Sequence, residues 1–401
     1  WARIAELARV EATLSRLFRS GRAIAPSLPT TRFNVHAALA TSLVCATALA
    51  GCVDAAWPAA SNPATPFAVG GDLVVDDGAR GVLWYIVAAP PGSSDAPAVK
   101  RVEYDGLRGQ TVLAADGKAR FWLDSGDVNR AAKVARVGDG AAGVVGVALG
   151  APFSGLRACD DGVGVLAFHA DGVNAATLVN TAEIALVDPD VAVAAGSKPG
   201  DGVVRATASG LARAPHDGGC SGKIALQDGD HRLVWVMARS AIGLLDIGPT
   251  GGKSAVVPLV APDSTAAISP KQTIAVAGKD SVDLYVIANG SNDVLHLRVG
   301  LGGDAPAVSL DQIGLGGVPI ALEVFTSSAG LRAVTLNVNP PGVSLVNPET
   351  GAAITVPLDG PADAWTLFDG LDGKRYAVTY GAAGTSARIS RIALDALEKK
   401  K

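Results

Sequence analysis

Residues 282–299 read VDLYVIANGSNDVLHLRV, and this stretch decides the fold class. Two runs of β-branched and large apolar residues flank a short polar segment that contains Asn289 and Gly290. Apolar runs of this length, bounded by turn-forming residues, predict two antiparallel strands joined by a tight hairpin. His296 lies between two leucines in the second run, and we expect it to face solvent or to cap a strand edge.

The same hairpin pattern returns along the chain. First strands are predicted at 233–236, 284–287, 333–336 and 376–379, and second strands at 242–247, 294–299, 343–346 and 387–392. The first strands begin 51, 49 and 43 residues apart, a period that matches one four-stranded blade of a β-propeller. Weaker echoes begin at Leu83, Phe121 and Val165.

This period predicts an all-β fold, a β-propeller of seven blades with four antiparallel strands each. Six or eight blades are alternative counts, and a pair of β-sandwiches is the other interpretation. Twelve Asp-Gly pairs and 48 glycines in 401 residues fit many tight connections. The same composition argues against a coiled coil, a helical bundle or a disordered chain. A short helix is predicted only within residues 389–401.

Residues 282–299, together with 331–351 (LRAVTLNVNPPGVSLVNPETG), resemble the YVTN-type propeller repeat. In that repeat an inner strand ends in an Asn-containing turn, and the next strand carries an apolar run. The resemblance implies a seven-bladed secreted propeller with a central funnel. It does not imply an enzyme, because many such propellers bind or scaffold. Since propellers usually close by sharing a blade between the chain ends, we expect a strand near 67–75 to pair in the sheet of the strands at 375–393.

The apolar run 35–50 (VHAALATSLVCATALA) has the character of a signal-peptide core. It is shorter than the roughly 20 residues that span a bilayer. It ends at Leu49-Ala50-Gly51-Cys52, which resembles the bacterial lipobox. The resemblance implies that Cys52 is lipidated and becomes the first mature residue. The alternatives are an ordinary cysteine after a secretory signal, or a buried helix at 35–50.

These signals divide the chain into four parts. Residues 1–51 form an N-terminal extension with a lipoprotein signal peptide, and 52–65, rich in Ala and Pro, form a flexible tether. Residues 66–393 form the β-propeller and 394–401 a C-terminal tail. Val53 is not the Asp that retains enteric lipoproteins at the inner membrane. We therefore expect a lipid-anchored protein of the cell envelope, more at the outer membrane than the inner.

Two cysteines remain in the body, Cys159 and Cys220, and both lie in Gly-rich segments. In an oxidising compartment they are expected to form a disulfide. Two free thiols are the alternative, while a metal site has little support because neither has a Cys or His neighbour at ligand spacing.

Polar residues from two hairpin segments offer a candidate funnel or loop site. They are His216, Asp217, Asp228, Asp230 and His231. The competing interpretation is that they are solvated Asp-Gly turns. GPTGGKS (248–254) is one residue short of a phosphate-binding loop and precedes a strand-like run, so a hairpin is predicted there. We predict no catalytic residue, no metal and no cofactor.

The charge balance excludes one class of partner. The first 51 residues carry six Arg and two Glu, so the rest of the chain is more acidic than the net charge of −4 suggests. An acidic body repels a phosphate backbone, so no nucleic-acid partner is expected. The sequence favours a scaffold that binds membrane lipid through Cys52 and other envelope proteins through its propeller. The alternatives are a propeller hydrolase or dehydrogenase with a small substrate in the funnel, and a merely structural surface protein.

Overall fold

The computed structural model describes residues 66–69, 72–77, 82–87, 98–103, 111–113, 120–123, 130–134, 144–170, 182–192, 198–211, 215–261, 265–381 and 388–398. The chain divides into two compact units, Trp1–Pro58 and Ala59–Lys401, and every described residue lies in the second. The predicted signal peptide, the predicted tether and Cys52 therefore lie outside the described residues. Within the described part, no helix has the length and apolar character needed to cross a membrane.

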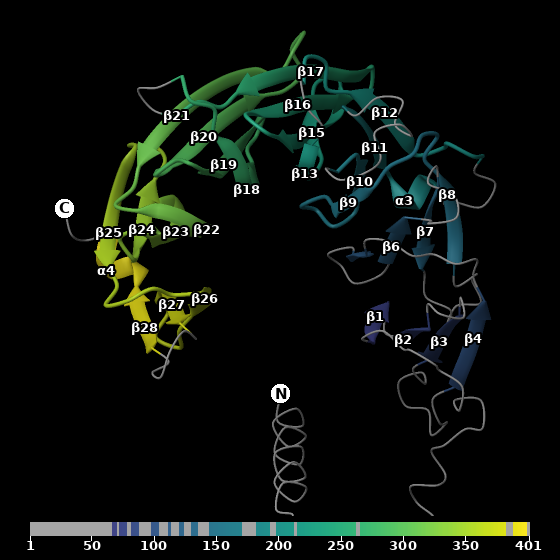
Figure 1. The fold of residues 1–401 in the computed structure, drawn as a ribbon. Coiled ribbons are helices and arrows are strands. Elements are labelled where there is room, and N and C mark those ends of the chain that lie inside the picture. The colour runs from purple at the N-terminus through teal and green to yellow at the C-terminus, as the bar shows by residue number, and fades with distance from the viewer. Residues whose placement is uncertain are drawn as a thin grey trace, which may run out of the picture. The chain divides into compact units, whose positions relative to one another are not determined.

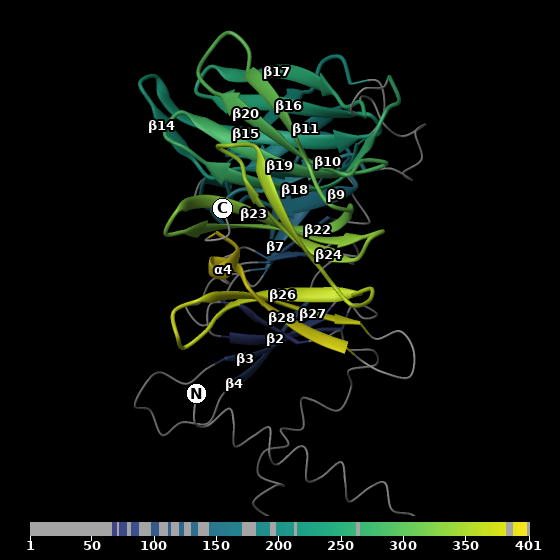
Figure 2. The same cartoon turned by 90° about the vertical axis from the view of Figure 1, so that its left-hand side faces the viewer.

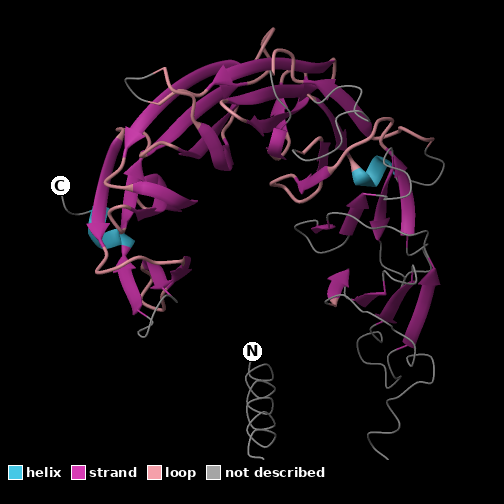
Figure 3. Ribbon diagram, viewed as in Figure 1, coloured by secondary structure: helices cyan, strands magenta, loops and turns pink. Residues whose placement is uncertain are grey.

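The described residues form seven antiparallel sheets, numbered here in chain order, and two short helices (Figures 1 and 3). Sheet 1 comprises β1 (Phe67–Val69), β2 (Asp72–Asp77), β3 (Val82–Val87) and β4 (Ala98–Glu103). Sheet 2 comprises β5 (Thr111–Leu113), β6 (Arg120–Leu123), β7 (Arg130–Val134) and β8 (Val144–Ala148). Sheet 3 comprises β9 (Gly155–Ala158), β10 (Val165–Phe168), β11 (Glu183–Val187) and β12 (Val203–Thr207), and α3 (Pro189–Ala192) connects its last two strands.

The later sheets have longer strands. Sheet 4 comprises β13 (Pro215–Cys220), β14 (Ile224–Leu226), β15 (Gly229–Ala238), β16 (Ala241–Gly248) and β17 (Gly251–Pro258). Sheet 5 comprises β18 (Ser269–Ala277), β19 (Ser281–Asn289), β20 (Asp293–Gly300) and β21 (Ala307–Gly314). Sheet 6 comprises β22 (Val318–Ser327), β23 (Gly330–Val338), β24 (Gly342–Asn347) and β25 (Ala352–Pro357). Sheet 7 comprises β26 (Ala364–Asp369), β27 (Arg375–Gly381) and β28 (Arg388–Ala393), followed by α4 (Leu394–Glu398).

Consecutive sheets pack face to face through shared apolar clusters. Sheet 5 shows why its middle strands, β19 and β20, contain continuous apolar runs. On β19, Leu284 and Val286 pack against sheet 4, whereas Tyr285 and Ile287 pack against sheet 6. Because successive side chains of a strand point to opposite faces, a strand between two sheets is apolar at every position. Four-stranded meanders stacked in this way make the fold a β-propeller, as predicted.

All eight hairpin strands predicted in the second half of the chain are confirmed. They fall in β15, β16, β19, β20, β23, β24, β27 and β28. The segment 248–254 is a hairpin between β16 and β17, in which Gly248 pairs with Gly251. The short terminal helix is α4, whose Leu394 and Leu397 are buried against sheets 6 and 7. α4 contacts β27, and Figure 2 shows the helix together with the strands of sheet 7.

The predicted closure between the chain ends is wrong. β1 pairs with β2, with Val69 opposite Asp72, and sheet 7 contains no strand from 67–75. The physical reason is local. Only two residues, both Gly, separate β1 from β2, and a two-residue glycine connection favours a hairpin over a distant pairing.

Candidate functional site

A cavity of about 240 Å³ lies where sheet 3 meets sheet 4. The ionisable side chains that line it are Asp188, Lys223, Asp230, His231 and Arg232. Asp188 follows β11, Lys223 lies between β13 and β14, and the other three are consecutive residues of β15. Two of the five residues predicted as a polar site, Asp230 and His231, therefore line the cavity.

His231 is held between two carboxylates. Its Nδ1–H donates to Oδ1 of Asp246 at 2.6 Å, and its Nε2–H donates to Oδ1 of Asp228 at 3.1 Å. Only 3% of the His231 side chain and 1% of the Asp246 side chain are exposed. Burial alone would lower the pKa of His231, but the hydrogen bonds and charges of Asp246 and Asp228 outweigh burial and raise it. The imidazole is thus stabilised in its charged form.

The local backbone makes room for this imidazole ring. β15 pairs with β16 so that Arg232 lies opposite Ile247, which places His231 beside Gly248. A Cβ at Gly248 would lie 2.5 Å from Cε1 of His231. The second oxygen of Asp246, Oδ2, accepts the N–H of Gly302 at 2.7 Å, just after β20 of sheet 5. The His231–Asp246 pair therefore also ties sheet 4 to sheet 5.

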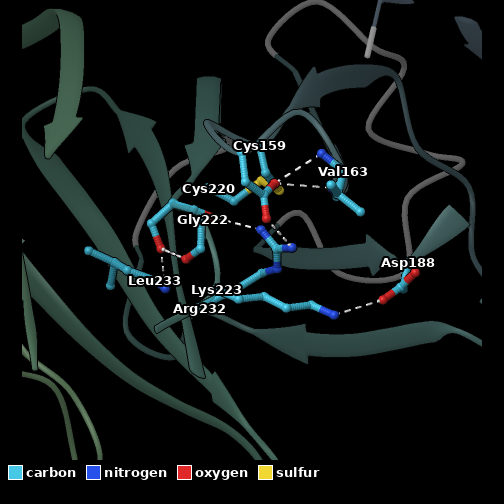
Figure 4. A network of polar contacts seen from close by, with 11 residues as sticks. Cys159, Val163, Asp188, Cys220, Gly222, Lys223, Arg232 and Leu233 are labelled. Atoms are coloured by element: carbon cyan, nitrogen blue, oxygen red, sulfur yellow. Dashed lines mark hydrogen bonds and ion pairs between the residues drawn. A yellow bond between two sulfur atoms is a disulfide. The ribbon is translucent and has the colours of Figure 1, made fainter. Parts of the chain in front are cut away.

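The side chain of Arg232 lies on the face of β15 opposite to His231 and is held there by hydrogen bonds (Figure 4). Its Nη2 donates to Oδ2 of Asp161 at 2.6 Å, and its Nη1 donates to the carbonyl of Ser221 at 2.7 Å. Burial disfavours the charged form of Asp161, but Arg232 and the N–H groups of Val163 and Gly164 hold the pKa of this carboxyl below its usual range. This buried guanidinium is fixed in place by its partners.

A disulfide lies beside Arg232 and joins sheets 3 and 4. It links Cys159, just after β9, to Cys220 at the end of β13, with 4.6 Å between the two Cα atoms. The N–H of Asp160 also donates to the carbonyl of Cys220 at 2.9 Å. Both cysteines are buried. This wall of the cavity is therefore held covalently as well as by ion pairs.

The cations of the cavity are already paired within the protein. Nζ of Lys223 lies 3.2 Å from Oδ2 of Asp188, and Arg232 and His231 have the partners described above. Asp230 is exposed and is in none of these pairs. Paired charges in fixed positions can recognise a polar group, but a general base or nucleophile needs a side chain with a free reactive atom. In the described part of the chain, no three His, Cys, Asp or Glu side chains form a group that could hold a metal ion.

The other two predicted site residues lie elsewhere. On β13, Nε2 of His216 donates to the carbonyl of Pro270 in β18 at 2.9 Å. The neighbouring Asp217 accepts a hydrogen bond from Nε of Arg157 in β9 at 2.8 Å. His216 and Asp217 thus link the first strands of sheets 3, 4 and 5. They do not share the cavity with Asp230 and His231.

Two features were missed from the sequence. Asp246 is a single acid inside the apolar run of β16, and such a buried charge was itself a signal that a partner exists. The second feature is a repeated proline at the start of the first strand, at Pro215, Pro270 and Pro319. Each is followed by a shift in strand register, which marks a bulge. A bulge near the start of an edge strand tolerates proline, because the N–H that proline lacks is not needed for the ladder there.

The expectation for His296 is wrong. This residue is 5% exposed, and its ring stacks on the ring of Tyr285, with 4.8 Å between the ring centroids. Its Nε2 donates to Oδ1 of Asp283 at 2.9 Å, while its buried Nδ1 has no hydrogen-bond partner among the described residues. The flanking leucines pack toward sheet 4 and His296 lies on the face of sheet 5 toward sheet 6, so both faces of β20 are covered.

No protein-family model and no curated protein sequence matches the chain. Among solved structures, a dihydro-heme d1 dehydrogenase is similar over 83% of this chain and 66% of its own, slightly less than two thirds, with 14% identity and a TM-score of 0.44. A virginiamycin B lyase from Staphylococcus aureus is similar over 80% of this chain and 92% of its own, with 12% identity and a TM-score of 0.36. Prolyl oligopeptidase B from Galerina marginata is similar over 84% of this chain and 49% of its own, with 13% identity and a TM-score of 0.40.

Proposed function

We propose that this chain is a lipid-anchored protein of the bacterial cell envelope, more at the outer membrane than the inner, whose propeller binds other proteins without catalysis. The single observation that carries the proposal is the position and the pairing of the cysteines. Cys52 stands at the end of the lipobox-like Leu49-Ala50-Gly51, while the two cysteines of the body are joined in a buried disulfide. Disulfides persist in oxidising compartments outside the cytoplasm, which agrees with export.

The binding role is supported by how the charged groups of the cavity are used. Lys223 is paired with Asp188, Arg232 with Asp161, and His231 with Asp246. These pairs stabilise contacts between sheets, so the ionisable groups act as structural ties. Stacked sheets held in this manner give a rigid body with many exposed loops, which is the form of a binding platform.

Lipid anchoring is tested in cells that express the full chain. Metabolic labelling with an alkyne fatty acid should label the wild-type protein, which should fractionate with membranes. A Cys52→Ala variant should lose the label, because the thiol is the expected acyl acceptor, whereas Cys45→Ala should keep it. An unlabelled wild-type protein would contradict the anchor.

Protein binding is tested by cross-linking in the intact envelope. The expected result is a reproducible partner that binds again when the purified full-length protein and the purified partner are mixed. Absence of any partner that binds again in this reconstitution would contradict the platform role. The labelling result does not depend on this outcome, so the two parts of the proposal fail separately.

A further inference from the structure

The hairpin that joins β26 to β27 presents a leucine to solvent. Residues 369–375 read DGLDGKR, and Leu371 is the most exposed large apolar residue of the described structure. The hairpin connections within sheets 4 to 6 contain a single leucine, Leu301, which packs against the apolar cluster between sheets 4 and 5. Leu371 belongs to none of the apolar clusters formed by the described residues. It therefore contributes no packing to the fold.

The backbone on both sides of Leu371 is held by hydrogen bonds. At the base of the hairpin, Arg375 donates to both carboxylate oxygens of Asp369, from Nε at 2.6 Å and from Nη2 at 2.7 Å. Above this pair, the N–H of Gly370 donates to the carbonyl of Lys374 at 2.8 Å. The N–H of Gly373 donates to the carbonyl of Gly370 at 3.0 Å. These bonds fix the path of the chain through the tip.

The acid next to the leucine is bound within the same hairpin. Oδ2 of Asp372 accepts the hydroxyl of Tyr376 at 2.6 Å, and its Oδ1 accepts the N–H of Lys374 at 3.3 Å. The ring of Tyr376 is held in turn by stacking on Phe368, with 5.3 Å between the ring centroids. Single exposed apolar residues are common on protein surfaces, but this one stands on a tip whose conformation is fixed. A fixed group loses little freedom on binding, which favours affinity.

The charges around the tip select its occupant. Residues 369–375 carry two acids and two bases, so the tip is neutral but highly charged. Inserting it into hydrocarbon would remove four charged groups from water, and burial of one leucine does not offset that cost. A contact that seats the tip of one copy in a cavity of the next copy is heterologous and would propagate into a filament. A pocket on a different protein can bury the leucine while the charged groups stay in water at its rim.

We infer that Leu371 is a binding anchor that inserts into an apolar pocket, of side-chain size, on a partner protein. The inference rests on the proposed protein-binding function and names the residue through which that function acts. The side chain is fully exposed in the free protein, so its whole apolar surface is available for burial in a complex.

The first test uses the purified full-length chain and the purified partner from the reconstitution described above. Leu371→Asp should weaken binding at least about tenfold, because it places a charge in an apolar pocket. Leu371→Met should stay within about threefold of the wild type, since it conserves apolar volume. Leu310→Asp, the same change on the exposed strand β21, should alter binding by less than about twofold. Urea unfolding should show equal stability for Leu371→Asp and the wild type.

A second variant separates the fixation of the tip from the burial of the leucine. Tyr376→Phe removes the hydroxyl that binds Asp372 and leaves Leu371 in place. The loosened tip must be ordered when it binds, so affinity should fall about threefold. Affinity unchanged by this variant would contradict the role of the fixed tip.

The third test identifies what Leu371 touches in the intact envelope. A photoreactive diazirine amino acid at position 371 of the full chain should cross-link to the same partner. Cross-linking to lipid alone, cross-linking to a second copy, or equal binding by the wild type and Leu371→Asp would each overturn the inference. Equal binding would remove only the anchor and keep the protein-binding role. Failure of any partner to bind again, with no protein cross-linked to position 371, would contradict both.

Discussion

Sheets 3 and 4 are joined differently from sheets 5 and 6. The strands of sheet 3 have four or five residues, and its contact with sheet 4 contains the Cys159–Cys220 disulfide and the Arg232–Asp161 pair. The strands of sheet 5 have eight or nine residues and meet sheet 6 through an apolar cluster around Tyr285 and Ile287. The contact between sheets 3 and 4 also has an apolar cluster, around Phe168 and Val236, and the covalent and ionic ties add to its stability.

The largest effect is expected from removing the covalent tie. The double variant Cys159→Ala/Cys220→Ala should lower the free energy of unfolding by roughly 4 kcal/mol, because the disulfide closes a long loop in the unfolded chain. The two cysteines are 61 residues apart. Urea unfolding of the oxidised wild type and the variant measures the difference. A reductant should destabilise the wild type and leave the variant unchanged. Equal stability of the wild type and the variant without reductant would contradict this prediction. The disulfide would then not distinguish the contact between sheets 3 and 4 from the contact between sheets 5 and 6.

The next effect concerns the tie between sheets 4 and 5. Asp246→Ala should cost about 3 kcal/mol in the free energy of unfolding, because it leaves His231 and the N–H of Gly302 without their buried partner. Asp228 also contacts His231 but is 51% exposed, so Asp228→Ala is the matched control and should cost less than about 1 kcal/mol. Similar losses for both variants in urea unfolding would show that burial does not set the strength of this cluster.

A smaller loss is expected between sheets 5 and 6. The amide of Gln272 donates to the carbonyl of Leu322 at 2.8 Å and accepts its N–H at 3.0 Å. Gln272→Ala should therefore cost about 2 kcal/mol in the free energy of unfolding, since it leaves two backbone groups unsatisfied. On the exposed strand β21, Gln312 makes a long bond to the carbonyl of Val260 at 3.3 Å. Gln312→Ala should change stability by less than about 0.5 kcal/mol. If Gln272→Ala lowered the free energy of unfolding as little as the control does, the contact between sheets 5 and 6 would depend on its apolar cluster alone.

The smallest expected effect is a pH dependence. The pKa of His231 is raised in the folded protein, so the folded state holds this proton more tightly than the unfolded state does. The resulting stabilisation is complete below the unfolded pKa of about 6.5 and is lost as pH rises through the folded pKa. Urea unfolding between pH 5 and 9 should show this decline in the wild type and not in His231→Gln. The same decline in the variant would assign it to another group.

The sequence predicted the second half of the fold better than the first. The middle strands of sheets 4 to 6, such as β16, β19 and β23, are buried on both faces and therefore read as long apolar runs. Strands such as β5, with three residues, and β6, with four, are too short to show a pattern. The echo at Leu83 falls in β3, the third strand of sheet 1, whereas the echoes at Phe121 and Val165 fall in second strands. In sheet 1 the repeat was therefore recognised one strand out of phase with sheets 2 and 3.

The candidate site was predicted in part, because strand register decides which polar residues meet. Asp228, Asp230 and His231 are close in sequence and remain close in the fold. Their main partner, Asp246, comes from the next strand, and its role depends on the pairing of β15 with β16. His216 and Asp217 share the same composition of His and Asp but contact the first strands of other sheets. Composition alone did not separate the two groups.

Proline is the first residue of β13 and the second residue of β18 and of β22, and this placement has a consequence for association. The first strand of each of these sheets is an edge, and a proline with an adjacent bulge interrupts the ladder that an invading strand would need. The axial edges of sheets 4, 5 and 6 are thereby guarded against polymerisation. Pairing between neighbouring molecules is thereby directed to the opposite edges of these sheets, β17, β21 and β25.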